Sequence, residues 1–129
     1  MPELSAPVWR TASIMAVDDN PANLKLLEGM LNQHGYGVRS FPRARLALAA
    51  AEREAPDLIL LDVDMPEMGG REFAKSVLKL RPGVKVLLMS GHTEEEALKG
   101  VNQAVAFLQK PYTPNALTQK VREILGLKT

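Results

Sequence analysis

The sequence contains no cysteine, which excludes disulfide bonds, thiolate catalysis and cysteine-ligated metal sites and fits a reducing compartment. No run approaches the roughly 20 apolar residues that a membrane-spanning helix needs. Residues 1–12 combine Pro2, Glu3, Pro7 and Arg10 with no apolar run, so no signal peptide is expected there. The sequence also lacks a large net charge. The net charge is +1 and no cluster of basic residues stands out, so a nucleic-acid partner is not expected. A soluble cytoplasmic domain is therefore expected.

One stretch, Asp57–Pro66, carries the most information. Its four consecutive apolar residues, Leu58–Leu61, are typical of a strand buried on both faces, as in a parallel sheet covered by helices. Asp62 follows this strand, where an unpaired charge would be costly. The carboxyl ends of strands in open α/β sheets are ligand-binding positions, so Asp62 is a candidate site residue. The alternative is an Asp that only caps a turn.

Strand and helix patterns alternate five times, which predicts an α/β fold with a parallel sheet and helices on both faces. A length of 129 residues indicates one domain, with residues 1–12 as a tail and 13–127 as the folded part. Helices are expected to begin at Asn20-Pro21, near Ala44, near Arg71, at Thr93 and at Thr113-Pro114. The expected strands are 13–17, 36–41, 58–61, 84–89 and 105–108.

Polar residues follow four of these strands: the acids Asp18 and Asp19, then Asp62, Ser90 and Lys110. Because the carboxyl ends of parallel strands share one edge of the sheet, these side chains are expected to meet in one crevice. Three crowded carboxylates must raise their pKa values or bind a cation, and hard oxygen ligands suit Mg²⁺. A lysine and a hydroxyl beside the metal suit phosphoryl oxygens.

Four motifs contain these polar residues: Val17–Asn20, Leu60–Gly70, Leu88–Gly91 and Gln109–Pro111. With these motifs, the sequence resembles the receiver domain of bacterial response regulators. The similarity runs through residues 13–126 and implies a doubly wound, flavodoxin-like (βα)5 fold with strand order 2-1-3-4-5. The sequence around Met89–Thr93 and Phe107–Pro114 is most similar to receivers attached to hybrid sensor kinases.

The resemblance implies a phosphoacceptor role without enzymatic turnover of other substrates. Asp62 would take a phosphoryl group from the phosphohistidine of a kinase or a histidine phosphotransfer protein. Lys110, in a cis peptide with Pro111, would pair with the phosphoryl oxygens, and Ser90 would hydrogen-bond one of them. Phe107 stands at the switch position of the family and would turn inward as Ser90 moves; the alternative is that it belongs to the core.

The resemblance also implies the metal ligands. Asp19 and Asp62 would bind Mg²⁺ through their side chains and Asp64 through its backbone carbonyl, while Asp18 would act mainly through water. Asp64 and His92 stand two residues beyond the acceptor and the hydroxyl residue, where they would tune the lifetime of the phosphoryl group. Histidine titrates near neutrality, so this lifetime is expected to depend on pH unless His92 is merely a solvated loop residue.

Two other functions stay open at this point. Asp62-Val63-Asp64 also suits a haloacid-dehalogenase-like phosphatase, although that family has its motifs in the opposite order and Pro66 suits it poorly. A pure interaction module that no longer takes phosphate is the other. No effector domain is evident after Leu127, so the expected output is a partner protein, a relay step or a domain outside this sequence. In the family the surface of the last two helices and the strand between them often forms homodimers.

Overall fold

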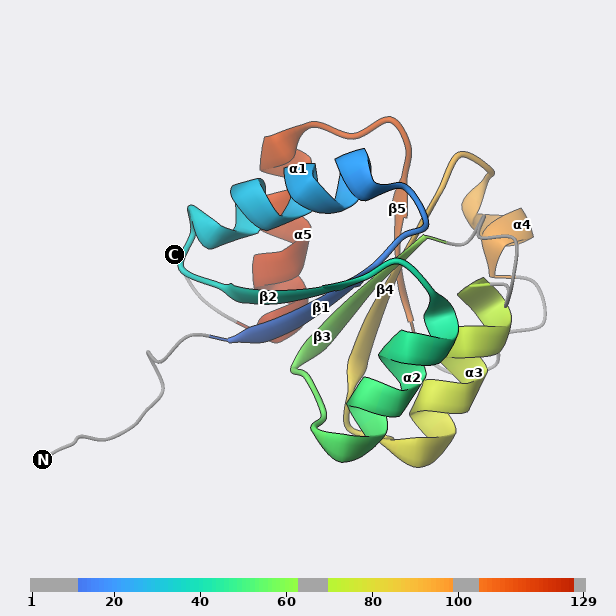
Figure 1. The fold of residues 1–129 in the computed structure, drawn as a ribbon. Helices are drawn as coiled ribbons and strands as arrows, with labels where there is room; N and C mark the ends of the chain where they lie inside the picture. The colour runs from blue at the N-terminus through green and yellow to red at the C-terminus, as the bar shows by residue number, and fades with distance from the viewer. Residues whose placement is uncertain (1–11, 63–69, 99–104, 127–129) are drawn as a thin grey trace, which may run out of the picture.

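A computed structural model of the chain describes residues 12–62, 70–98 and 105–126 (Figure 1). A five-stranded sheet runs through the middle, with the strands in the order β2-β1-β3-β4-β5 and every neighbouring pair parallel. This order confirms the expected doubly wound α/β fold. The strands are β1 Ser13–Val17, β2 Gly37–Phe41, β3 Leu58–Asp62, β4 Lys85–Ser90 and β5 Ala106–Gln109. The helices are α1 Pro21–Asn32, α2 Ala44–Arg53, α3 Gly70–Leu80, α4 Glu94–Ala97 and α5 Pro114–Leu125.

Helix starts follow the capping residues of the sequence. The Asn20 side chain accepts hydrogen bonds from the N–H groups of Ala22 and Asn23, and Pro21 gives up an N–H that the first turn would leave unpaired. The Thr113 hydroxyl likewise caps α5 through the Ala116 N–H. Such capping bonds fix where the chain turns from a strand end into the next helix.

The strands β2, β4 and β5 each begin one residue later than expected, and for β2 and β4 the reason is hydrogen bonding. Tyr36 and Val84 are apolar and buried, but their N–H groups bond to the carbonyls of Leu31 and Arg81 in the preceding turns. An N–H engaged in a turn is not available to a neighbouring strand, so pairing starts at Gly37 and Lys85. Hydrophobic patterning marks burial, whereas the backbone bonds set the boundary.

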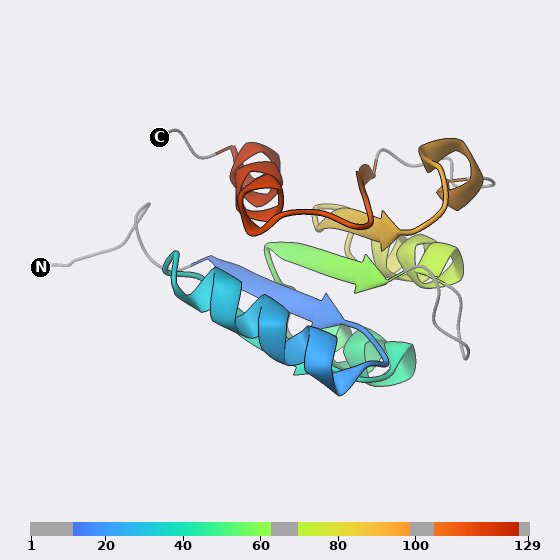
Figure 2. The same ribbon diagram turned by 90° about the horizontal axis from the view of Figure 1, so that it is seen from above.

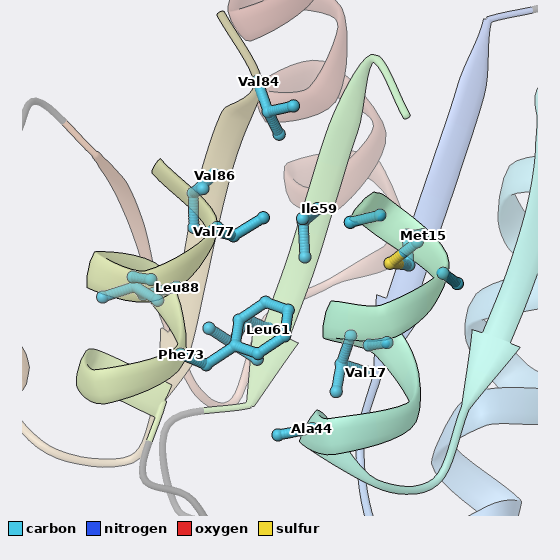
Figure 3. Close-up of a cluster of buried hydrophobic side chains, with 14 residues drawn as sticks. Met15, Val17, Ala44, Ile59, Leu61, Phe73, Val77, Val84, Val86 and Leu88 are labelled. Carbon is cyan, nitrogen blue, oxygen red and sulfur yellow. The ribbon is translucent and has the colours of Figure 1, made fainter. Parts of the chain in front are cut away.

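Helices cover both faces of the sheet, with α1 and α5 on one face and α2 and α3 on the other (Figures 1 and 2). All four residues of Leu58–Leu61 are fully buried, because successive side chains point into opposite layers. The α2–α3 cluster, shown in Figure 3 with ten of its residues labelled, consists of Met15, Val17, Ala44, Ala47, Ala50, Ala51, Ile59, Leu61, Phe73, Ala74, Val77, Val84, Val86 and Leu88. The α1–α5 cluster consists of Ile14, Ala16, Leu24, Leu27, Leu31, Tyr36, Leu58, Leu60, Leu87, Met89, Leu117 and Val121.

The two edges of the sheet differ in chemistry. At the amino end of β3, the exposed Asp57 accepts a 2.7 Å hydrogen bond from the Ser13 N–H and donates its own N–H to the Ser13 carbonyl. Asp57 therefore connects the start of β3 to the start of β1. At the carboxyl end of the same strand lies Asp62, and the parallel register places Val17 beside Leu61 and Met89 beside Asp62. The residues that follow β1 and end β4 are therefore brought to the edge where Asp62 lies.

Among the described helices, none combines the length and the apolar character that a bilayer span requires.

Candidate functional site

Three carboxylates gather where β1 and β3 end. One oxygen from each of Asp18, Asp19 and Asp62 lies within 4.8 Å of the others. Asp18 is 2% exposed and Asp62 is 5% exposed, whereas Asp19 faces solvent. Parallel pairing of β1 with β3 explains the gathering, because the residues after Val17 leave the sheet next to the last residue of β3.

A single lysine enters this acidic group from the chain after β5. The Lys110 Nζ lies 3.2 Å from Asp62 Oδ1, and the lysine side chain keeps 31% of its surface exposed. Its backbone N–H donates a 2.8 Å bond to the Ser90 carbonyl, which attaches the start of this loop to the end of β4. The peptide bond between Lys110 and Pro111 is cis. The ammonium therefore lies against a buried carboxylate, while part of the lysine side chain is exposed to water.

Ser90 is the last residue of β4 and has no exposed surface. Its Oγ accepts a 3.0 Å hydrogen bond from the N–H of His92. Asp62 pairs with Met89 in the sheet, so the hydroxyl residue is one position further along the neighbouring strand. Ser90 thus belongs to the same edge as Asp62 and Lys110.

The surroundings of the buried Asp18 disfavour its ionised form. Burial raises the pKa of Asp18, and the charge of Asp62 raises it further; the backbone N–H of Asn20, the side chain of Asn23 and the charge of Lys110 oppose this. The pKa of the Tyr112 phenol is raised as well, by burial and then by the charges of Asp18 and Asp62. Burial disfavours the ionised form of a carboxylate, so a bound cation that neutralises its charge stabilises that form.

Asn23 and Tyr112 are site neighbours that the sequence reasoning missed. Asn23 lies in the first turn of α1 and Tyr112 lies two residues after Lys110, half-buried against the α1–α5 cluster. A usable signal did exist for Asn23. It stands three residues after the capping Asn20, on the first helical turn, and a polar side chain there can reach back to the strand end that precedes the helix.

Of the remaining predicted residues, the structure describes Phe107 in β5 and His92 in the segment after β4. Phe107 is half-buried, pairs with Leu88 across the sheet and packs against the α2–α3 cluster. The His92 side chain is 63% exposed, with Nδ1 3.7 Å from Glu96 Oε1. Asp64 lies outside the described residues.

The donor set fits a small hard cation. Three carboxylates supply oxygen ligands only, and the exposed Asp19 leaves a side open to solvent, which suits an ion that keeps several of its waters. Burial of Asp18 beside Asp62 supplies the negative charge that such an ion neutralises. The residues present therefore fit Mg²⁺.

Comparison with known proteins agrees with this geometry. The sequence pattern of the response regulator receiver domain family matches residues 14–122. The chain belongs to this family. A solved CheY-like response regulator receiver domain protein from Methanospirillum hungatei JF-1 superposes with a TM-score of 0.84 at 33% identity, over 90% of this chain and 94% of that one.

Curated relatives of this receiver domain are longer proteins of more than one kind. The transcriptional regulatory protein CreB of Escherichia coli is 31% identical over 88% of this chain, which spans 50% of CreB. The sensor protein GacS of Pseudomonas syringae pv. syringae is 30% identical over 92% of this chain, which spans 14% of GacS. Regulators and a sensor protein thus match at similar identity, and the finer expectation of a hybrid sensor kinase stays a prediction.

Proposed function

We propose that this receiver domain accepts a phosphoryl group on Asp62 from a phosphohistidine of a histidine kinase or a histidine phosphotransfer protein. The observation that carries the proposal is a buried carboxylate, Asp62, in contact with the Lys110 ammonium and beside two further acids at one sheet edge. A carboxylate needs neighbouring positive charge to approach an anionic phosphoryl group, and the Lys110 ammonium supplies part of it.

In the transfer, one Asp62 oxygen forms a bond to phosphorus while the bond from phosphorus to the donor imidazole nitrogen breaks. The nitrogen leaves with the bonding electron pair, so an acyl phosphate forms and no oxidant or reductant is needed. Lys110 already lies at Asp62 Oδ1 and can hold a phosphoryl oxygen on the same side. The Ser90 hydroxyl, now bonded by the His92 N–H, would hydrogen-bond a second oxygen.

Asp19 and Asp62 would hold Mg²⁺ with their side chains and Asp64 with its backbone carbonyl, and Asp18 would act through water. Bound Mg²⁺ would neutralise charge on the phosphoryl oxygens. The chain's own contribution is to keep the carboxylates together against their repulsion, through the hydrogen bonds that Asp18 receives and through the contact of Lys110 with Asp62.

The test is exposure of the protein to acetyl phosphate and Mg²⁺ followed by intact-mass measurement. A gain of one phosphoryl group supports the proposal. Absence of any gain under every donor tried would instead indicate a pure interaction module. The phosphatase alternative is not favoured by the family assignment, and turnover of a small phosphate ester would be needed to revive it.

Phosphorylation is expected to move Phe107. This side chain is half-buried in strand β5, two positions before Gln109, the β5 residue that pairs with Ser90, so a shift of Ser90 toward a phosphoryl group would leave space for the ring to turn inward. Addition of beryllofluoride, a phosphate mimic, should shift the aromatic NMR signals of Phe107. Those of Phe41, which packs against the same α2–α3 cluster from β2, should change much less. Equal behaviour of the two rings would identify Phe107 as ordinary core.

Lifetime of the acyl phosphate is expected to depend on His92 together with Asp64. The His92 N–H donates to Ser90 Oγ while its imidazole is exposed to solvent beside Glu96, so this residue links the hydroxyl side of the site to solvent. His92→Ala should shorten the lifetime several-fold, as measured by loss of the phosphoryl mass with time. Glu94→Ala, a change at an exposed residue of the same segment, should not. An unchanged lifetime in His92→Ala would leave His92 as a loop residue.

For output, we propose that the face formed by α4, β5 and α5 engages a partner protein, an attached output domain or a second copy of the chain. A cytoplasmic location and the absence of direct nucleic-acid contacts belong to the same proposal.

A further inference from the structure

Both oxygens of the Asp18 carboxylate are hydrogen-bonded by the start of α1. Oδ1 accepts a 2.9 Å bond from the backbone N–H of Asn20, and Oδ2 accepts a 3.3 Å bond from the side-chain Nδ2 of Asn23. One donor on each oxygen fixes the plane of the carboxylate as well as its position. The first of these donors is main chain and cannot be removed by substitution, whereas the second is a side chain and can be.

The position of Asn23 is itself set by the helix cap. Its backbone N–H donates to the Asn20 side chain, and Pro21 fixes the first turn between them. The side chain is half-buried and extends from this turn toward the end of β1. Asn23 therefore has little freedom to leave Asp18.

The chemical type of residue 23 matters at this location. An amide offers a neutral donor, which satisfies one oxygen of the buried Asp18 carboxylate without adding a charge. A lysine or arginine would donate with a full positive charge, which would compete with a metal cation for Asp18. An aspartate would add a fourth negative charge and remove the donor. Asparagine satisfies the carboxylate and leaves the net charge of the acidic group unchanged.

We propose that Asn23 is a positioning residue for Asp18 that sets the Mg²⁺ affinity of the acidic site. The inference rests on the proposed function only in taking Mg²⁺ as the cation. Asn23 acts through Asp18, to which its side chain is hydrogen-bonded. Outer partners that orient metal ligands change metal affinity by about ten- to a hundredfold when removed, and because Asp18 would act through a metal-bound water the effect of Asn23 is expected at the lower end of this range.

The test is titration of the phosphate-free protein with Mg²⁺ alone, followed by backbone amide NMR shifts around the site. Asn23→Ala, which deletes the donor and adds no bulk, should bind Mg²⁺ roughly tenfold more weakly than the parent. Asn23→Gln keeps an amide donor on a longer stem and should restore most of the affinity. Asn32→Ala, at the exposed last residue of α1, is the matched control and should bind as the parent does.

The outcomes separate the inference from the function on which it rests. A parent that fails to saturate with Mg²⁺ would overturn the magnesium site and this inference with it. A parent that saturates, together with Asn23→Ala of equal affinity, would overturn the role of Asn23 alone. Alanine is the best helix former and Asn23 is only half-buried, so Asn23→Ala should fold. If it does not, failure of Asn23→Gln to bind more tightly than Asn23→Ser would overturn the role instead.

Discussion

Replacing Asp62 with asparagine is expected to abolish uptake of a phosphoryl group from acetyl phosphate. The variant keeps the shape of the side chain, so the buried site at the end of β3 should stay folded. The amide oxygen is a far weaker nucleophile than a carboxylate and cannot form a stable acyl phosphate. In the presence of Mg²⁺, intact-mass measurement should show one added phosphoryl group in the parent protein and none in Asp62→Asn.

Asp57→Asn, directly before the same strand, offers a matched control. Asp57 and Asp62 flank the apolar run of β3 but lie at opposite edges of the sheet, and Asp57 bonds to the Ser13 N–H through an oxygen that asparagine retains. Asp57→Asn should therefore be labelled like the parent. A phosphoryl group on Asp62→Asn would contradict the assignment and direct attention to Asp19, the exposed acid of the site.

The fold and the candidate site residues could be predicted because a few physical rules relate the apolar runs of this sequence to the layers of the sheet. Runs such as Leu58–Leu61 must be buried on both faces, and buried parallel strands need helical crossovers. The residues that follow parallel strands therefore lie at the same edge of the sheet. This is why Asp62 and Lys110, 48 positions apart in the chain, lie 3.2 Å from each other.

What could not be predicted depends on side-chain direction rather than on sequence order. The bond from Asn23 to Asp18 requires a particular rotamer and a particular entry angle of α1, and neither follows from helical spacing. The proximity of Tyr112 to the acids depends on the path of the chain after the cis peptide at Pro111. Similarly, the strand starts at Gly37 and Lys85 depend on turn hydrogen bonds that apolar patterning does not reveal.

The acidic site should reduce the stability of the fold when no cation is bound. In the folded protein the pKa of Asp18 lies above its ordinary value of 3.8, mainly through burial and then through the charge of Asp62. Below the ordinary value the group is protonated in both states and the penalty is absent. As pH rises through the folded pKa, the unfolded chain has already released its proton, so ionisation favours unfolding and stability is lost. At neutral pH the ionised Asp18 is therefore expected to cost stability.

Asp18→Asn is accordingly expected to be more stable than the parent at neutral pH in the absence of divalent cations. The free energy of unfolding should rise by on the order of 1 kcal/mol, which moves Tm by about 4 °C in a domain of this size. The asparagine oxygen can still accept the Asn20 N–H, and the Asn23 amide can turn its own oxygen toward the new NH2 group. The advantage should shrink as pH falls toward the ordinary range of aspartate, about 4.

Magnesium should reverse this order of stability. A ligand at a hundred times its Kd stabilises the folded state by about 2.7 kcal/mol, and the parent should gain this while Asp18→Asn gains much less. Thermal unfolding of both proteins with EDTA and with excess Mg²⁺ measures the two effects together, with Asp57→Asn as the control for loss of an acid elsewhere. If Asp18→Asn is less stable than the parent in EDTA, then the hydrogen bonds from Asn20 and Asn23 outweigh burial, and the charged Asp18 stabilises the fold by itself.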